Sequence, residues 1–181
     1  KFLSKKQIND VAPSVFTNHP SSEVTEKYTF IPTEKVIDDM EMLGWKPVDA
    51  KEVNARTKAT KGFQKHLLVF RNNDVIINGE DGDTVYPQIL LTNSHDGKNS
   101  FQFTAGLFRM ICENGLVIAD TEFEDVKMRH MGYTFEDLQS MIKEMVEKLP
   151  LTVESMNRMK NIELEEERVL DLAKSLLDIR V

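Results

Sequence analysis

Between Asn93 and Val117 the chain reads NSHDGKNSFQFTAGLFRMICENGLV. Asp96-Gly97 is the signature of a tight hairpin turn, because glycine accepts the positive φ that such turns require. The alternation of polar and apolar residues from Asn99 to Thr104 predicts a strand that pairs back across this turn. The run Leu107–Glu113 predicts a short helix, which Asn114-Gly115 would end. Together, hairpin, strand and helix indicate an α+β fold.

This apolar segment contains several polar side chains, and each of them has a structural and a functional interpretation. His95 and Asp96 form the one tempting acid/base pair, but Asp96 also suits the turn itself. Cys112 is either a packed hydrophobe or a reactive thiol. Arg109 either pairs internally, with Asp96 or Glu113 as partner, or faces a groove where its planar fork would suit phosphate.

Outward from this segment, further strands and helices complete the fold class. Lys65–Phe70, Tyr86–Thr92 and Val24–Ile31 predict strands. Ser4 and Gln7 have the spacing of a capping box, so a short helix is expected to follow Ser4. Thr33 is expected to cap a helix with an apolar face. We therefore predict a mainly antiparallel sheet of four to six strands with packed helices and a helical C-terminal third.

The C-terminal region reads as helical. An apolar stripe begins at Phe135 and is expected to end at Pro150, because proline breaks a helix interior. Another helix is expected over Glu163–Ile179. The predicted division is an N-terminal helix and linker over 1–22, an α+β core over 23–133 and a helical region over 134–181.

Composition narrows the class of protein. The chain has 181 residues, 40% of them hydrophobic, a net charge of −7 and one cysteine. One cysteine cannot form an intramolecular disulfide, which suits a reducing cytoplasm. No apolar run reaches membrane-spanning length, so no membrane partner is expected. Histidine and cysteine lack metal-ligand spacing, and phosphate-loop and dinucleotide motifs are absent, so neither metal nor cofactor is expected.

A basic segment stands out in this acidic chain. From Lys46 to Arg71 there are seven basic and two acidic residues. Its centre, Asn54–Gly62, is polar and is expected to be an exposed hairpin loop. Lysine and arginine neutralise phosphates, while an aromatic face stacks on an unpaired base. The alternative is a solvated loop that balances an acidic protein. The candidate nucleic-acid-binding residues are Trp45, Arg56, Lys58, Lys61, Phe63, Lys65 and Arg109.

The central segment resembles the phage/plasmid-like proteins grouped as domain-of-unknown-function family 932. The matching positions are Asn93, Ser94, His95, Asp96 and Gly97 in the turn, then Gly106, Arg109, Cys112, Asn114 and Gly115. The similarity covers roughly Val24 to Met131. The resemblance implies residence on mobile elements, and so in the cytoplasm of a bacterial host cell, and supplies no established activity.

A second similarity concerns the order of elements. A helix, Leu43-Gly44-Trp45, a strand, a basic hairpin, further strands and a helix resemble single-strand annealing proteins of phage recombination. In those proteins a hairpin sheet and a helix form a groove for single-stranded DNA. This is an analogy of fold, and fold does not determine function.

Three hypotheses follow for function. The first is a non-enzymatic nucleic-acid-binding protein of phage or plasmid origin that acts on single strands in recombination or replication. Such a protein could form homo-oligomers. The second is a protein–protein interaction module, such as an inhibitor of a host factor, with methionine-rich helices as its adaptable surface. The third is an enzyme that uses His95, Asp96 and Arg109.

Overall fold

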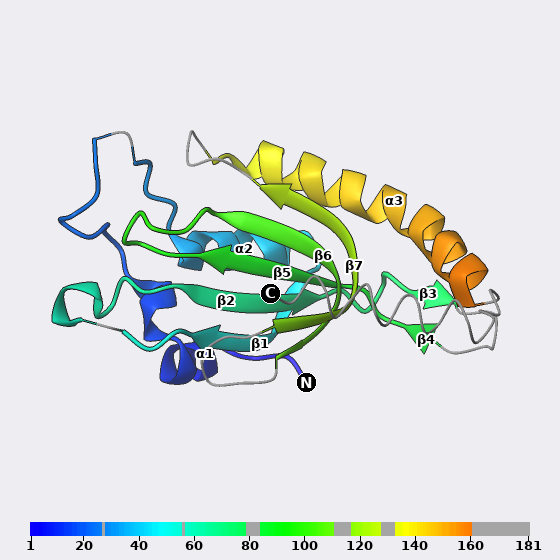
Figure 1. Cartoon of the computed structure of the whole chain (residues 1–181), viewed down its shortest axis with the longest axis horizontal. Helices are drawn as coiled ribbons and strands as arrows, with labels where there is room; N and C mark the ends of the chain where they lie inside the picture. Colours follow the sequence, from blue (N-terminus) through cyan, green and yellow to red (C-terminus); the bar gives the residue numbers. More distant parts are fainter. Residues whose placement is uncertain (27, 56, 79–83, 111–116, 128–132, 161–181) are drawn as a thin grey trace, which may run out of the picture.

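An antiparallel sheet organises the molecule (Figure 1). The computed structural model describes residues 1–26, 28–55, 57–78, 84–110, 117–127 and 133–160. The five strands of the sheet lie in the order β1-β2-β5-β6-β7, and every neighbouring pair is antiparallel. They are β1 (Lys46–Glu52), β2 (His66–Arg71), β5 (Gln88–Asn93), β6 (Gln102–Met110) and β7 (Val117–Lys127). A separate two-stranded ladder joins β3 (Ile77–Asn78) to β4 (Thr84–Val85).

The two faces of the sheet differ. All of β2 from His66 to Phe70 is buried. Successive side chains point to opposite faces, so Leu68 and Phe70 join the main core, whereas Leu67 and Val69 pack with Leu90 in a second cluster. The continuous apolar run of this strand therefore reflects burial on both faces, and the predicted strand at this position is confirmed.

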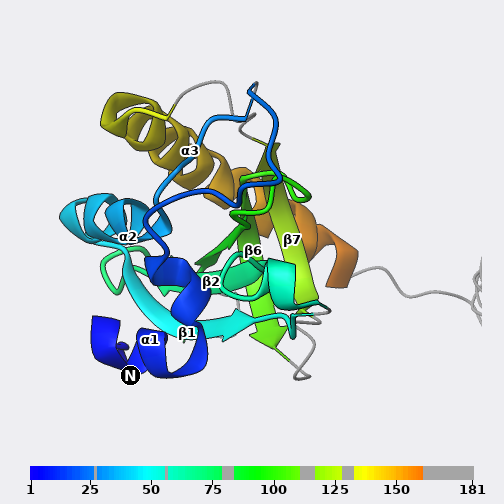
Figure 2. The same ribbon diagram turned by 90° about the vertical axis from the view of Figure 1, so that its left-hand side faces the viewer.

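Helices cover the main-core face, and Figure 2 shows α2 (Thr33–Met42) and α3 (Phe135–Lys160) on the same side of the sheet. The side chains that α3 buries are Leu138, Met141, Ile142 and Met145. They recur at three- and four-residue intervals, as an amphipathic helix requires. The predicted apolar stripe is confirmed over these positions.

The N-terminal helix α1 (Lys5–Val11) begins at the predicted capping box. The Gln7 amide donates to the Ser4 hydroxyl at 3.3 Å, and the Ser4 amide donates to Gln7 Oε1 at 2.9 Å. Ile8 of this helix and Val15 of the following 3₁₀ helix η1 (Pro13–Phe16) are fully buried in the main core. The N-terminal region therefore shares the hydrophobic core of the sheet.

Thr33 does not cap α2, contrary to the prediction. Pro32 occupies the N-cap position and Thr33 is the first helical residue. The Thr33 hydroxyl lies 2.8 Å from Nε2 of His66, and both side chains are buried. A hydroxyl oriented toward a histidine in β2 is not available to its own helix amides, so tertiary contact replaces the local cap.

The helix predicted over Leu107–Glu113 is wrong for its first four residues, which belong to strand β6. Leu107 pairs with Thr121 and Arg109 pairs with Ile118 of β7. A short apolar run does not distinguish a helix from a buried strand by its periodicity. The neighbouring strand decides, because it supplies hydrogen-bond partners for the backbone of β6. Cys112, Asn114 and Gly115 lie outside the described residues.

The strand predicted over Val24–Ile31 is also wrong. Turns close its backbone, with the Val24 amide donating to the Ser21 carbonyl at 3.3 Å and the Tyr28 amide to the Thr25 carbonyl at 2.9 Å. The alternation arises because Ile31 is buried and Tyr28 is half-buried against the rest of the protein. Single anchor residues in a loop thus imitate the pattern of a strand.

The break predicted at Pro150 does not occur, since α3 continues to Lys160. The helix predicted over Glu163–Ile179 lies outside the described residues. Within the described part of the chain, no helix is both long and apolar enough to cross a membrane. Antiparallel strands and packed helices together confirm the α+β class.

Candidate functional site

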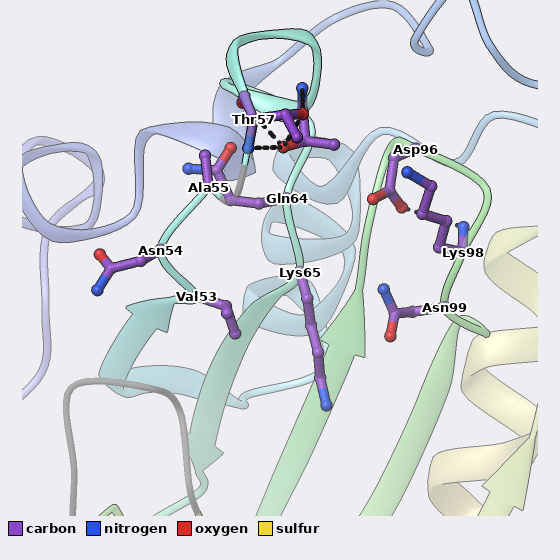
Figure 3. Close-up of a pocket in the computed structure, with 10 residues that line it drawn as sticks. Val53, Asn54, Ala55, Thr57, Gln64, Lys65, Asp96, Lys98 and Asn99 are labelled. Carbon is purple, nitrogen blue, oxygen red and sulfur yellow. Dashed lines mark hydrogen bonds between the residues drawn. The ribbon is translucent and has the colours of Figure 1, made fainter.

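A cleft lies between the loop that joins β1 to β2 and the turn that joins β5 to β6 (Figure 3). Its volume is about 480 Å³, which is within the range of small-ligand sites. The lining residues are Val53, Asn54, Ala55, Thr57, Thr60, Gln64 and Lys65 from the loop, and Asp96, Lys98 and Asn99 from the turn. The predicted basic loop and the predicted turn therefore form opposite walls of one site.

The strand register explains why these walls meet. β2 and β5 are adjacent, and His66 pairs with Asn93 at the end of both strands. Lys65 lies just outside this pair on one strand, and the turn that begins at Ser94 lies just outside it on the other. Both therefore leave the sheet at the same end of the two strands. The cleft is thus a consequence of a single antiparallel pairing.

The charges that line the cleft are two ammonium groups and one carboxylate. Lys65 is half-buried and forms no ion pair with any residue that the structure describes. Lys98 lies 3.9 Å from the exposed carboxylate of Glu23, at the outer limit of an ion pair. Such an exposed pair contributes little stability. Both lysines are therefore able to bind an anion without losing a strong partner.

Hydrogen bonds within the turn fix the orientation of Asp96. Its Oδ1 atom accepts from the Ser94 hydroxyl at 2.7 Å and from the Lys98 amide at 3.0 Å. The Asn99 amide in turn donates to the Ser94 hydroxyl oxygen at 3.3 Å. This arrangement is the turn chemistry expected of aspartate. The two hydrogen bonds to Oδ1 also fix the orientation of the Asp96 carboxylate at the wall of the cleft.

The opposite wall is held by Gln64. Its Oε1 accepts from the Gly62 amide at 2.6 Å, and its Nε2 donates to Glu52 Oε1 at 2.8 Å. The other oxygen of Glu52 accepts from the Ser14 amide at 2.9 Å. Because both ends of its amide group form hydrogen bonds, Gln64 has a fixed position in the wall of the cleft.

A pair of buried histidines adjoins the cleft residues in sequence, since His66 follows Lys65 and His95 precedes Asp96. His66 and His95 are both fully buried, and their ring centroids are 5.0 Å apart. Nδ1 of His66 lies 3.2 Å from the Gln64 carbonyl, which can only accept, so Nδ1 carries the ring proton and Nε2 accepts from the Thr33 hydroxyl at 2.8 Å. The Thr33 oxygen also accepts from the Asn93 amide at 3.0 Å. Nδ1 of His66 also lies 3.1 Å from the Ser14 hydroxyl.

Burial and, second, the neighbouring positive charge that His95 can carry together lower the pKa of His66 to about 3. His66 is therefore neutral at pH 7. His95 packs its ring against Phe30 at 4.9 Å between centroids and does not reach the cleft surface. The acid/base pair of His95 with Asp96 is not formed at the cleft, because one partner is buried and the other is bound within the turn.

Asn93 joins the N-terminal segment to the sheet. It is fully buried, and its Nδ2 donates to the Ile31 carbonyl at 3.2 Å as well as to Thr33. Close by, the Tyr28 hydroxyl donates to the Ser94 carbonyl at 2.9 Å, and burial raises the pKa of Tyr28 to about 12. The family-like turn is therefore the point at which a long loop is fastened to the sheet.

The structure separates the nucleic-acid-binding candidates. Lys58 and Lys61 are exposed on the loop, next to the lining residues Thr57 and Thr60, while Lys65 lines the cleft itself. Phe63 is half-buried and meets the ring of His19 edge-on, at 5.3 Å between centroids. Arg56 lies outside the described residues.

Trp45 is not at this site. Trp45 is 2% exposed in the main core and has no free face for a base, which corrects its predicted role. Arg109 lies in β6, where it pairs with Ile118 of β7. Its side chain lies outside the described part of the structure, so its contact with a groove stays a prediction.

Lys98, Asn99 and Asn54 were not among the predicted binding residues. Their one sequence signal is position, since Lys98 directly follows Asp96-Gly97. A lysine after a turn is common on any surface. Its relation to Lys65 depends on the pairing of β2 with β5, which local pattern does not reveal.

Replacing Gly97 by Ala is expected to lower the free energy of unfolding by about 1–2 kcal/mol, because Gly97 has a φ of 71°. A Cβ there would also lie 3.3 Å from Cγ1 of Val24. Urea denaturation measures the change. Gly62→Ala is the matched control, since Gly62 has a φ of 90° and open space around it. Equal losses in the two variants would contradict a role for the Val24 contact.

The chain is similar in sequence to known proteins of one family. A family model described as Domain of unknown function (DUF932) matches residues 20–180. The chain is similar to two Escherichia coli K12 proteins, UPF0380 protein YafZ (35% identical) and UPF0380 protein YfjQ (34% identical), each over 130 residues. The aligned part makes up 72% of this chain and 45% of each relative, so the chain spans less than half of their length. No solved structure matches.

Proposed function

The chain belongs to the DUF932 family of unknown function, and we propose that it is a non-enzymatic nucleic-acid-binding protein of phage or plasmid origin that binds single strands in recombination or replication. One observation carries the proposal. Lys65 and Lys98 line a single cleft, and the exposed Lys58 and Lys61 lie on the loop that forms its wall.

The charge distribution supports this proposal. The whole chain has a net charge of −7, so general attraction to polyanions is not expected. Lys58, Lys61 and Lys65 nevertheless form no ion pairs with described residues. Lysines that balance an acidic surface would be expected to pair with its carboxylates. Three lysines without such partners, on one loop, fit a surface that exchanges counterions for phosphates.

Shape favours a single strand over a duplex. The binding surface is a cleft, and the half-buried Phe63 lies beside it, directly before the lining residues Gln64 and Lys65. Proteins that bind single strands combine a cationic groove with aromatic side chains on which bases stack. With Trp45 buried, Phe63 is the aromatic side chain that would take this role.

Replacing both Lys58 and Lys61 by Gln is expected to weaken binding to a labelled single strand and to flatten its salt dependence. Each lost phosphate contact should reduce the slope of log K against log salt by about 0.7, so the pair should reduce it by about 1.4. Fluorescence anisotropy over a salt series measures both quantities.

The matched control replaces Lys6 and Lys143 by Gln, two exposed lysines on α1 and α3. This control changes the net charge by the same amount away from the cleft. An unchanged slope in the Lys58/Lys61 variant, or an equal change in both variants, would contradict the proposed phosphate contacts. Absence of binding by the wild type at low salt would contradict the function itself.

The alternative function, an interaction module that inhibits a host factor, has less support from the described residues. Met141 and Met145, two of the methionines that would form its adaptable surface, are buried in the main core of the sheet. They are therefore occupied by packing. The alternative would gain support if the wild type failed to bind nucleic acid.

A further inference from the structure

The negative charge of Asp96 is unfavourable in a site that binds only phosphates. A carboxylate repels a phosphodiester, and this one lines the same cleft as Lys65 and Lys98. Asp96 also lines a second, adjoining cleft of about 380 Å³, together with Lys98 and Tyr28. The turn therefore presents a negative group between two hollows. A ligand that only brought negative charge would be poorly matched to this arrangement.

One oxygen of Asp96 remains able to accept a hydrogen bond. Oδ1 accepts from Ser94 and from the Lys98 amide. Oδ2 has no hydrogen-bond partner among the described residues, and Asp96 is only partly buried. The two bonds to Oδ1 prevent the carboxylate from turning away. Asp96 is thus an oriented acceptor at the wall of a cleft that otherwise offers cations and amides.

Donors and acceptors are therefore both present in the cleft. The Asn54 amide forms no hydrogen bond with a described residue, and Lys65 has no ion pair with one. A ligand that satisfies all of these groups carries an anionic part, a hydrogen-bond donor for Asp96 and acceptors for the amide and ammonium groups. A nucleotide has this combination, whereas a bare sugar-phosphate backbone lacks the strong donor.

We propose that the cleft binds an unpaired base bearing an exocyclic amino group, with Asp96 Oδ2 accepting from that amine and Lys65 and Lys98 contacting the adjoining phosphates. This inference rests on the proposed single-strand binding and specifies what the site reads. An unpaired base is recognised through its Watson–Crick edge when it leaves the stack. The volume of the cleft, about 480 Å³, accommodates a ligand of this size.

The bases differ in whether they offer a hydrogen-bond donor to Asp96. Cytosine offers its N4 amine to a carboxylate, which is an established pairing of aspartate with a base. Thymine carries the O4 oxygen at the same position, so an acceptor would face the acceptor Asp96. The two pyrimidines are similar in size, and comparison of the two isolates this contact. Cytosine strands should bind about five- to tenfold more tightly than thymine strands.

The experiment measures binding of the wild-type chain and of Asp96→Asn to three labelled strands of about 20 nucleotides: oligo-dC, oligo-dT and an abasic strand. Asparagine retains Oδ1 for Ser94 and Lys98 and replaces Oδ2 by a donor. We expect the wild type to prefer oligo-dC, and Asp96→Asn to bind oligo-dC about fivefold more weakly and oligo-dT more tightly. The abasic strand should bind the wild type more weakly than either.

The outcomes separate the two proposals. Equal wild-type affinity for oligo-dC and oligo-dT overturns the base pocket, even if Asp96→Asn fails to fold. A parallel gain in affinity of Asp96→Asn for all three strands also overturns it, because Asp96 then only repels phosphates. If either result occurs while binding remains salt-dependent, the proposed function stands. If the wild type binds none of the strands at low salt, both proposals fall.

Discussion

Replacing Asn93 by Ala is expected to lower the free energy of unfolding by about 2–4 kcal/mol, the largest single loss that we predict. Asn93 is fully buried and forms three hydrogen bonds through its side chain. Alanine removes all three and leaves the Ile31 carbonyl and the Ser94 amide without those partners. An unsatisfied buried polar group costs about 1–3 kcal/mol, so the effect exceeds that of a surface amide.

Urea denaturation of the full chain, followed by circular dichroism, measures this loss. Asn54→Ala is the matched control, because it removes the same side chain from an exposed position without hydrogen bonds to described residues. Its effect should be within about 0.5 kcal/mol of zero. Similar losses in the two variants would show that Asn93 does not fasten the Ile31–Thr33 segment to the sheet.

Stability is expected to fall as the pH is lowered from 7 to 5, with about 2 kcal/mol of the loss coming from His66. Burial and His95 lower the pKa of His66 to about 3 in the folded protein. The ordinary value is about 6.5 in an unfolded chain. Between these two values the unfolded state binds the proton and the folded state does not. Stability is therefore fully present above pH 6.5 and is lost as the pH falls toward 3.

His66→Gln separates this contribution from that of other titrating groups. Glutamine has no proton to gain in this range, so its unfolding free energy should depend less on pH, by about 2 kcal/mol between pH 7 and 5. His19→Gln is the control, because it makes the same replacement at an exposed histidine. Parallel pH profiles for wild type and His66→Gln would contradict the burial of a neutral histidine.

Local pattern predicts the two walls of the cleft separately, with Lys65 as a phosphate ligand and Asp96 as a turn residue. Only the pairing of His66 with Asn93 brings them to one cleft. Trp45 shows the opposite error, since a lone tryptophan beside a basic segment suggested stacking, whereas the core buries it.

The sequence by itself determined the features that neighbouring residues create. The capping box at Ser4, the turn at Asp96-Gly97, the buried strand β2 and the apolar stripe of α3 all depend on contacts within a few residues or on periodicity, and the structure has each of them.

Only the tertiary structure decided the rest. It made Leu107–Met110 a strand by supplying β7 as a partner, and it left Val24–Ile31 a loop because no strand lies beside it in the described residues. It also buried the two histidines together and opened the cleft between two distant loops. The physical reason is the same in each case. Hydrogen-bond pairing and burial bring together residues that are far apart along the chain, and the local sequence pattern does not identify those partners.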